Sequence, residues 1–212
     1  MMDNEIKNWS GGLSFWLVPP ADQSALIQSI MPRRPVGSLL PGGDPLFASS
    51  YPAFLPHITL ASVRSGSELP ADLLTKFTEI RRSVRANFRS LEVSDHYFRS
   101  VLVAVETTTD LLALHEEIRS ALSHLSPSAP MFPHMSLSYI ADEDANTGER
   151  ARAAQLMKEA GVVYEDEGHQ TMSLRCGEAC LSGFDGEEIW LVNCEGPVEQ
   201  WVVCDKKALR SR

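Results

Sequence analysis

The sequence predicts an α+β protein of 212 residues that is built from two similar halves. Three observations lead to this prediction. A short motif occurs twice, as Pro-His-Ile-Thr-Leu at 56–60 and, 77 residues later, as Pro-His-Met-Ser-Leu at 133–137. A strand-helix-strand-helix pattern runs over 13–84 and recurs over 97–160. The tail beyond residue 171 alternates strand-like stretches with glycine-rich turns, which favours antiparallel pairing.

The first half begins with an apolar strand at 13–18 that ends at two prolines. Asp22 is predicted to cap a helix that ends near residue 30. Residues 32–55 are rich in proline and glycine and lead directly into the first motif, so we expect a flap over a site. After the motif strand, the apolar residues of 70–84 recur on one face of a helix.

A short strand closes the first half, and the second half repeats the order with a central strand, a long helix, the second motif strand and a further helix. Thr109 or Asp110 is predicted to cap the long helix, and Gly161 to end the last one. His115 and His124 on the long helix are expected at the surface. The five predicted ranges are 91–94, 97–105, 109–125, 134–140 and 149–160.

Three further strands are predicted in the tail, at 172–181, 188–195 and 200–204. We therefore expect a single bilobal domain, 1–212, with halves at about 13–94 and 97–204. A pseudo-twofold between the halves would bring the two motif strands together.

The motif itself predicts a pair of matching active groups. Side chains alternate along a strand, so the histidine and the hydroxyl residue of each motif share one face. The preceding proline places each histidine at a strand entrance, next to loops. One His-x-Thr triplet means little, but two in the same local frame predict that His57, Thr59, His134 and Ser136 line one cleft.

Two facing imidazoles suit general acid-base catalysis, because each titrates near pH ~6.5 and one can be neutral while the other is protonated. Thr59 and Ser136 are placed to hold the charged oxygens of a phosphoryl group. Such a site needs no metal or other cofactor. We assign His134 to activate water and His57 to protonate the leaving oxygen, and the symmetry of the motifs leaves the reverse open.

The composition limits the class of partner. The net charge is −9, which disfavours a long nucleic acid that needs many phosphates neutralised. No apolar run approaches the ~20 residues of a membrane span, and the N-terminus does not resemble a signal peptide. The four cysteines have no zinc-site spacing. We therefore expect a cytoplasmic monomer with reduced cysteines that acts on a small molecule.

The sequence resembles the 2H phosphoesterase superfamily along nearly its whole length, and within it the cyclic phosphodiesterases of fungi and plants. The resemblance implies a bilobal, pseudo-twofold fold in which two antiparallel-rich sheets line a central cleft, with helices outside. The proline- and glycine-rich segment 33–52 is longer than the resemblance to this family leads us to expect. The matching stretches are SFWLVPP at 14–20, FLPHITL at 54–60, YF at 97–98, PHMSLSY at 133–139 and WVVC at 201–204.

The resemblance implies hydrolysis of 2′,3′-cyclic nucleotides to 2′-nucleotides and of ADP-ribose 1″,2″-cyclic phosphate to ADP-ribose 1″-phosphate, a side route of tRNA splicing. It also implies that Tyr139 lines the pocket. Strict alternation would put Tyr139 on the opposite face from His134, so this assignment requires a twist or bulge. Trp16 or Phe98 is a candidate for stacking on a base or sugar, with a plain core role as the alternative. The implied acid-base pair is His57 and His134.

Two other functions stay open. One is a 2H enzyme, ligase-like or exonuclease-like, that processes RNA ends. Such an enzyme would need a basic track to hold the RNA strand, and the arginines at 81, 82, 85 and 89 could form one. We interpret these arginines as a solvated helix face. The other is a non-catalytic nucleotide-binding module. An alternative location is the Golgi, suggested for some fungal relatives, through a partner rather than an anchor.

Overall fold

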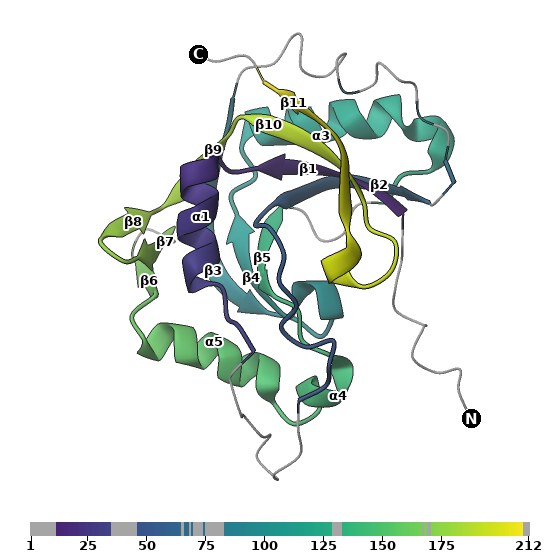
Figure 1. Cartoon of the computed structure of the whole chain (residues 1–212). Helices are drawn as coiled ribbons and strands as arrows, with labels where there is room; N and C mark the ends of the chain where they lie inside the picture. The colour runs from purple at the N-terminus through teal and green to yellow at the C-terminus, as the bar shows by residue number, and fades with distance from the viewer. Residues whose placement is uncertain are drawn as a thin grey trace, which may run out of the picture.

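The computed structural model describes residues 12–34, 46–64, 66–67, 69, 74, 83–128, 133–166, 168 and 171–209. An eight-stranded sheet has the order β11-β10-β1-β2-β5-β4-β3-β9, and a small sheet has the order β6-β7-β8 (Figure 1). The strands are β1 Gly12–Val18, β2 Ile58–Arg64, β3 Val84–Val93, β4 Val101–Val105, β5 His134–Ser138, β6 Val163–Asp166, β7 Thr171–Cys176, β8 Ala179–Leu181, β9 Gly183–Gly186, β10 Glu188–Asn193 and β11 Val202–Ala208.

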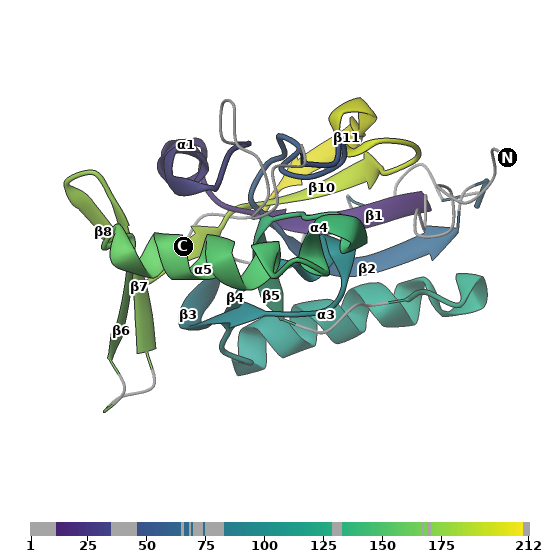
Figure 2. The same cartoon turned by 90° about the horizontal axis from the view of Figure 1, so that it is seen from below.

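Helices pack against this framework. Helix α3 contacts β2 and β3, α5 contacts β3 and β4, and α1 contacts β7. Figure 2 shows α3 running along one side of the strands. Within the described residues, no helix has the length and apolar character needed to cross a membrane. The helices are α1 Ala21–Ile30, α3 Thr109–Ala121, α4 Asp142–Ala145 and α5 Glu149–Glu159, with 3₁₀ turns η1 Tyr97–Arg99, η2 Ser123–Leu125 and η3 Val198–Gln200.

The two motif strands meet at the centre of the large sheet. β2 pairs antiparallel with β5 through Ile58 and Met135, so the sheet consists of two four-stranded halves joined at the motifs. The predicted α+β fold with antiparallel sheets is confirmed. Strand β3 pairs with β4, and β10 pairs with β1, so each half of the sheet draws on both parts of the chain. The domain division at 13–94 and 97–204 stays a prediction.

Both motif strands contain one extra residue at the same motif position. This residue is Leu60 in β2 and Leu137 in β5, three residues after the respective histidine, and both leucines are fully buried. A bulge of this kind turns the residues that follow it toward the other face. The flanking pairs are Phe15 with Ala61 and Trp16 with Thr59 for the first, and Val101 with Ser138 and Leu102 with Ser136 for the second.

Two predicted helix caps are wrong by one or two residues. Pro20 is the N-cap residue of α1, because its extended backbone (φ −50°, ψ 152°) directly precedes the helix, and Asp22 lies in the first turn. Thr108, not Thr109 or Asp110, caps α3, and its side chain accepts a hydrogen bond from the Leu111 amide. Gly161 follows α5 with φ +66°, which confirms its predicted role.

Some predicted strands have other bounds. The segment before β4 is the 3₁₀ turn η1 instead of a strand, and residues 172–181 form the β7–β8 hairpin instead of one strand. β3 starts at Val84, so the helix predicted for 70–84 does not reach that residue. Among the other residues of this range the structure describes Leu74, which is helical, and Ser83, which is not. β6 was not predicted.

Arg85 and Arg89 lie on β3, so their assignment to a helix face is wrong. Arg85 pairs with Asp185 and Arg89 pairs with Glu92, each at 3.3 Å. The other two arginines of the proposed track, at 81 and 82, lie outside the described residues.

His115 is buried, with 5% of its surface exposed, so its predicted surface position is wrong. It follows Leu114 on α3 and faces the packed side with Leu111 and Ile118. Burial lowers the pKa of His115, and the nearby Glu116 opposes this shift. His124 is exposed, as predicted.

The segment before the first motif is held to α4 and α5. The buried Asp144 carboxylate accepts hydrogen bonds from the Phe47 amide and the Ser50 hydroxyl. The Tyr51 hydroxyl donates to Glu149, at 2.6 Å. Residues 35–45 of the predicted flap lie outside the described part of the chain, and its role as a flap stays a prediction.

Candidate active site

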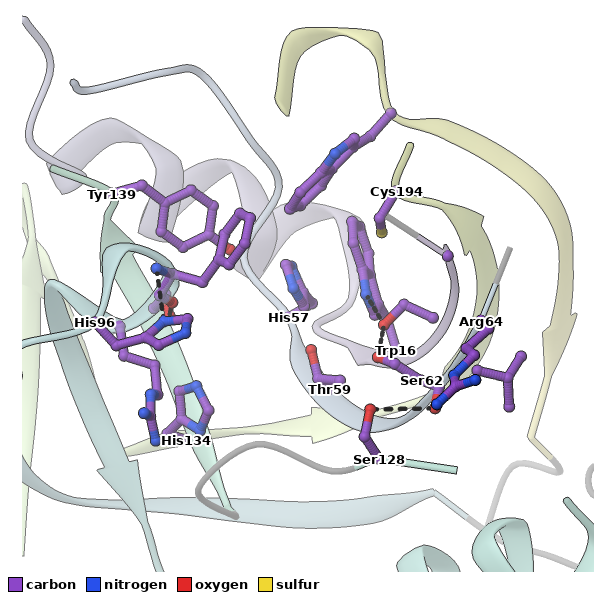
Figure 3. A pocket seen from close by; sticks show the side chains of 17 residues that line it. Trp16, His57, Thr59, Ser62, Arg64, His96, Ser128, His134, Tyr139 and Cys194 are labelled. Atoms are coloured by element: carbon purple, nitrogen blue, oxygen red, sulfur yellow. Dashed lines mark hydrogen bonds between the residues drawn. The ribbon is translucent and has the colours of Figure 1, made fainter. Parts of the chain in front are cut away.

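A pocket of about 350 Å³ opens over the junction of the two motif strands (Figure 3). All seven residues predicted from the sequence line it. They are Trp16, His57, Thr59, Phe98, His134, Ser136 and Tyr139.

The strand register explains why the motif residues converge. Ile58 and Met135 are a cross-strand pair, and both point into the core with 0% exposure. In an antiparallel ladder, the neighbouring positions then place His57 opposite Ser136 and Thr59 opposite His134, all on the other face. Figure 3 shows the side chains of His57, Thr59 and His134 together in the pocket.

His57 is fixed as a neutral tautomer. Its Nδ1 lies 2.7 Å from the Leu55 carbonyl oxygen, which can only accept, so Nδ1 carries the proton and Nε2 keeps a lone pair. Its ring stacks on Trp16 at 3.6 Å and 8°. Burial lowers the pKa of His57 to about 4, the Leu55 hydrogen bond opposes this shift, and the charge of His134 adds to it. His57 is therefore neutral at neutral pH.

His134 begins β5 and pairs with Ala104 of β4. Its side chain is 8% exposed and lines the pocket. A positive charge on His134 would lower the pKa of His57 further.

The two motif hydroxyls differ in their present hydrogen bonds. Ser136 Oγ donates to the Phe98 carbonyl oxygen at 2.7 Å. None of the described residues forms a hydrogen bond with the half-buried Thr59 hydroxyl. Thr59 can therefore donate directly to a bound anion, whereas the Ser136 hydroxyl must first rotate.

Tyr139 belongs to an aromatic cluster at one end of the pocket. It stacks on Phe54 at 4.0 Å and 5°, and Phe98 meets its ring edge-on at 5.3 Å. Trp201 lies 6.2 Å from it and 5.7 Å from Phe98. Burial raises the pKa of the Tyr139 hydroxyl. The bulge at Leu137 accounts for its presence on the pocket face, as its assignment required.

Trp16 is positioned by a hydrogen bond and by stacking. Its Nε1 donates to Ser14 Oγ at 2.9 Å, and one face of its ring is covered by His57. Trp16 therefore packs directly against the His57 imidazole, and its stacking on a base or sugar stays a prediction.

Several pocket residues were not predicted. Ser14 shares the strand face of Trp16 and could have been found by alternation. Ser62 and Arg64 could not, because the bulge at Leu60 changes their face. His96 and Arg99 flank or belong to η1, and Trp201 follows η3. The remaining unpredicted lining residues are Gly12, Val63, Ser128 and Cys194. The described residues contain no group of three or more His, Cys, Asp or Glu that could hold a metal ion.

The fold is shared with solved structures of low sequence identity. E. coli LigT complexed with NADP+ superposes with a TM-score of 0.50 at 15% identity, covering 94% of this chain and 98% of LigT. A protein of Thermus thermophilus gives a TM-score of 0.50 at 17% identity, with the same coverage.

The sequence match is more specific than the structural one. The family model described as cyclic phosphodiesterase-like protein matches residues 11–209, and the chain belongs to that family. A 2′,3′-cyclic-nucleotide 3′-phosphodiesterase of Yarrowia lipolytica (strain CLIB 122 / E 150) is 27% identical over 217 residues, covering 91% of this chain and 97% of the relative. The sequence-based prediction of the family is confirmed.

Proposed function

We propose that this chain hydrolyses 2′,3′-cyclic nucleotides to 2′-nucleotides by metal-independent acid-base catalysis. One observation carries the proposal: the pairing of Ile58 with Met135 places both motif histidines and both hydroxyls on one face of the pocket. Membership of the cyclic phosphodiesterase-like family and the Yarrowia relative support the substrate class.

In this mechanism His57 is the general base. Its Nε2 lone pair takes a proton from water while the water oxygen attacks phosphorus, and the bond from phosphorus to the 3′ oxygen breaks. His134 donates a proton to that 3′ oxygen, so the phosphate stays on the 2′ oxygen. Thr59 and Ser136 donate hydrogen bonds to the non-bridging oxygens, where negative charge is held.

The geometry around His57 favours this assignment over the one preferred from the sequence. A base must be deprotonated at the working pH, and His57 has a pKa lowered to about 4 with its Nδ1 proton committed to Leu55. An acid with so low a pKa would rarely be protonated at neutral pH. The reverse assignment, left open by the sequence, is therefore the one that we propose.

We also propose ADP-ribose 1″,2″-cyclic phosphate as a substrate, with ADP-ribose 1″-phosphate as the product. Its five-membered cyclic phosphate presents the same strained phosphodiester to the two histidines. Phe98 and Trp201 of the aromatic cluster line the pocket beside Tyr139 and offer π faces for a base, and such stacking is tolerant of base identity.

The test is turnover of 2′,3′-cyclic AMP in EDTA, with the product isomer identified. We expect 2′-AMP from the wild type, and at least ~100-fold slower turnover from His57→Ala and from His134→Ala, because each removes one general acid-base step. His124→Ala is the matched control, since His124 is exposed on η2 and lies outside the pocket lining. Binding without turnover in the wild type, or equal rates for all variants, would contradict the proposal.

A further inference from the structure

The two ends of the pocket are equivalent by position but different in chemistry. Ser62 lies five residues after His57, and Tyr139 lies five residues after His134, each beyond the extra residue of its strand. One half therefore places an aromatic ring where the other places a small hydroxyl. Figure 3 shows Ser62, Arg64 and Ser128 on the side of Thr59 away from Tyr139 and His134.

The end of the pocket at Ser62 is a polar surface whose residues are held in place by hydrogen bonds. Ser62 Oγ lies 3.1 Å from Ser14 Oγ, which in turn accepts the Trp16 indole proton. The Ser62 and Ser128 backbones exchange two hydrogen bonds of 2.8 Å, which fixes Ser128 beside β2. Arg64 is the last residue of β2, pairs with Gly12 and lines the same pocket.

The charge of the lining differs from that of the chain. The sequence has 28 acidic and 19 basic residues, and a net charge of −9. The described residues that line the pocket nevertheless include Arg64 and Arg99 and no carboxylate. An anion is therefore attracted at this end of the pocket, because Arg64 offers donors suited to phosphate and no lining acid neutralises it.

The ribose determines which anion reaches this end. A 2′,3′-cyclic phosphate held over the histidines fixes the 2′–3′ edge of the sugar. The base on C1′ and the 5′ carbon on C4′ then leave the ring on opposite flanks. If the base lies in the aromatic cluster, the 5′ substituent points toward Ser62. Thr59 pairs with Trp16 and Ser62 pairs with Ser14, two residues apart on β1. Strand rise therefore spaces Thr59 and Ser62 by roughly 7 Å, a span that a ribose with a 5′-phosphoryl group can bridge.

We propose that Arg64, with the Ser62 and Ser128 hydroxyls, forms a subsite for a phosphoryl group on the 5′ oxygen of the cyclic nucleotide. This inference rests on the proposed function and deepens it, since it names the part of the substrate that the second end of the pocket binds. The subsite selects 5′-phosphorylated 2′,3′-cyclic nucleotides over the unphosphorylated nucleosides.

The experiment compares kcat/KM for adenosine 2′,3′-cyclic phosphate and its 5′-phosphorylated form. We expect the wild type to prefer the 5′-phosphorylated form about tenfold, the scale of one exposed charge-assisted hydrogen bond. High salt reduces this preference. Arg64→Met removes most of it and Arg64→Lys retains part. Arg175→Met, on the exposed side of β7 and outside the pocket lining, keeps it.

A third substrate, the dinucleotide ApA with a 2′,3′-cyclic end, distinguishes two sources of the phosphate. If the wild type prefers this dinucleotide, as well as the 5′-phosphorylated nucleotide, over adenosine 2′,3′-cyclic phosphate, the subsite binds the internal phosphodiester of an RNA end. If the wild type prefers the 5′-phosphorylated nucleotide alone, the subsite binds a free nucleotide. Equal kcat/KM for the first two substrates in the wild type overturns the inference. So does a preference lost in Arg99→Met but kept in Arg64→Met. Absence of turnover with all three substrates refutes the proposed function, and the subsite with it.

Discussion

Ile58 of β2 and Met135 of β5 form the cross-strand pair at the junction of the two sheet halves, and neither side chain is exposed. Each lies directly after a motif histidine, so the packing of this pair determines how far apart the two imidazoles are. The core beneath the pocket is therefore part of the geometry of the candidate site.

Met135→Ala is expected to lower the free energy of unfolding by about 2–5 kcal/mol, because it leaves a cavity beneath the site. Met135→Leu conserves volume and should change it by less than about 1.5 kcal/mol. Denaturant unfolding measures both. Leu156→Ala on α5, where the side chain is 49% exposed, is the control and should stay within about 0.5 kcal/mol of the wild type. A loss below about 1 kcal/mol for Met135→Ala would show that this pair does not hold the junction.

The acid side of the kcat/KM profile should fall near pH 4, because the free enzyme needs neutral His57 and its pKa is lowered to about 4. Trp16→Leu uncovers one face of the imidazole, so the pKa of His57 should rise and the acid limb should move to higher pH. Measuring kcat/KM for hydrolysis of 2′,3′-cyclic AMP across pH, in the wild type and in Trp16→Leu, tests both expectations. An acid limb that stays in place in Trp16→Leu would assign the base to another group.

The stability of the protein should also depend on His57. Its pKa is about 4 in the folded protein and about 6.5 in the unfolded chain, so between these values the unfolded state binds more protons. The contribution of the neutral His57 imidazole to the free energy of unfolding is fully present above pH ~6.5. It is lost as the pH falls toward 4, by up to about 3 kcal/mol.

In His57→Gln this loss should be absent. The difference between the two unfolding curves isolates His57 from other histidines with lowered pKa values, such as His96 and His115. Parallel pH dependence of wild type and His57→Gln would contradict the burial of an uncharged imidazole.

Thr59→Val should lower kcat by about 100-fold, the typical effect of losing one donor to a charged transition state. Thr59→Ser keeps the hydroxyl and should stay within a few-fold of the wild type. Steady-state kinetics on 2′,3′-cyclic AMP separates kcat from KM. If Thr59→Val raised KM alone, the hydroxyl would serve ground-state binding and not the reaction.

The sequence predicted the position of the motif residues in the pocket better than the full pocket lining. Alternation within the repeated motif was sufficient to place His57, Thr59, His134 and Ser136 together, because a strand has a strict period of two. The extra residues at Leu60 and Leu137 have no marker in the sequence, and they decide which side chains beyond them enter the pocket. Ser62 and Arg64 were missed for this reason.

Tertiary packing explains the other errors. His115 was placed at the surface by its polarity, but its position on α3 next to Leu114 puts it against the sheet. The turn η1 was predicted as strand because its aromatic residues have strand propensity, whereas Tyr97 and Phe98 are used in the aromatic cluster.

The matching bulges have a consequence for how such a pocket can diversify. In each strand the motif histidine and hydroxyl residue precede the extra leucine, and Ser62 or Tyr139 follows it. A substitution at Ser62 or Tyr139 can therefore change the pocket wall without changing the strand position of a histidine. Under the proposed function, each of the two matching strands can acquire its own preference, aromatic for one and anionic for the other, while the two histidines stay together.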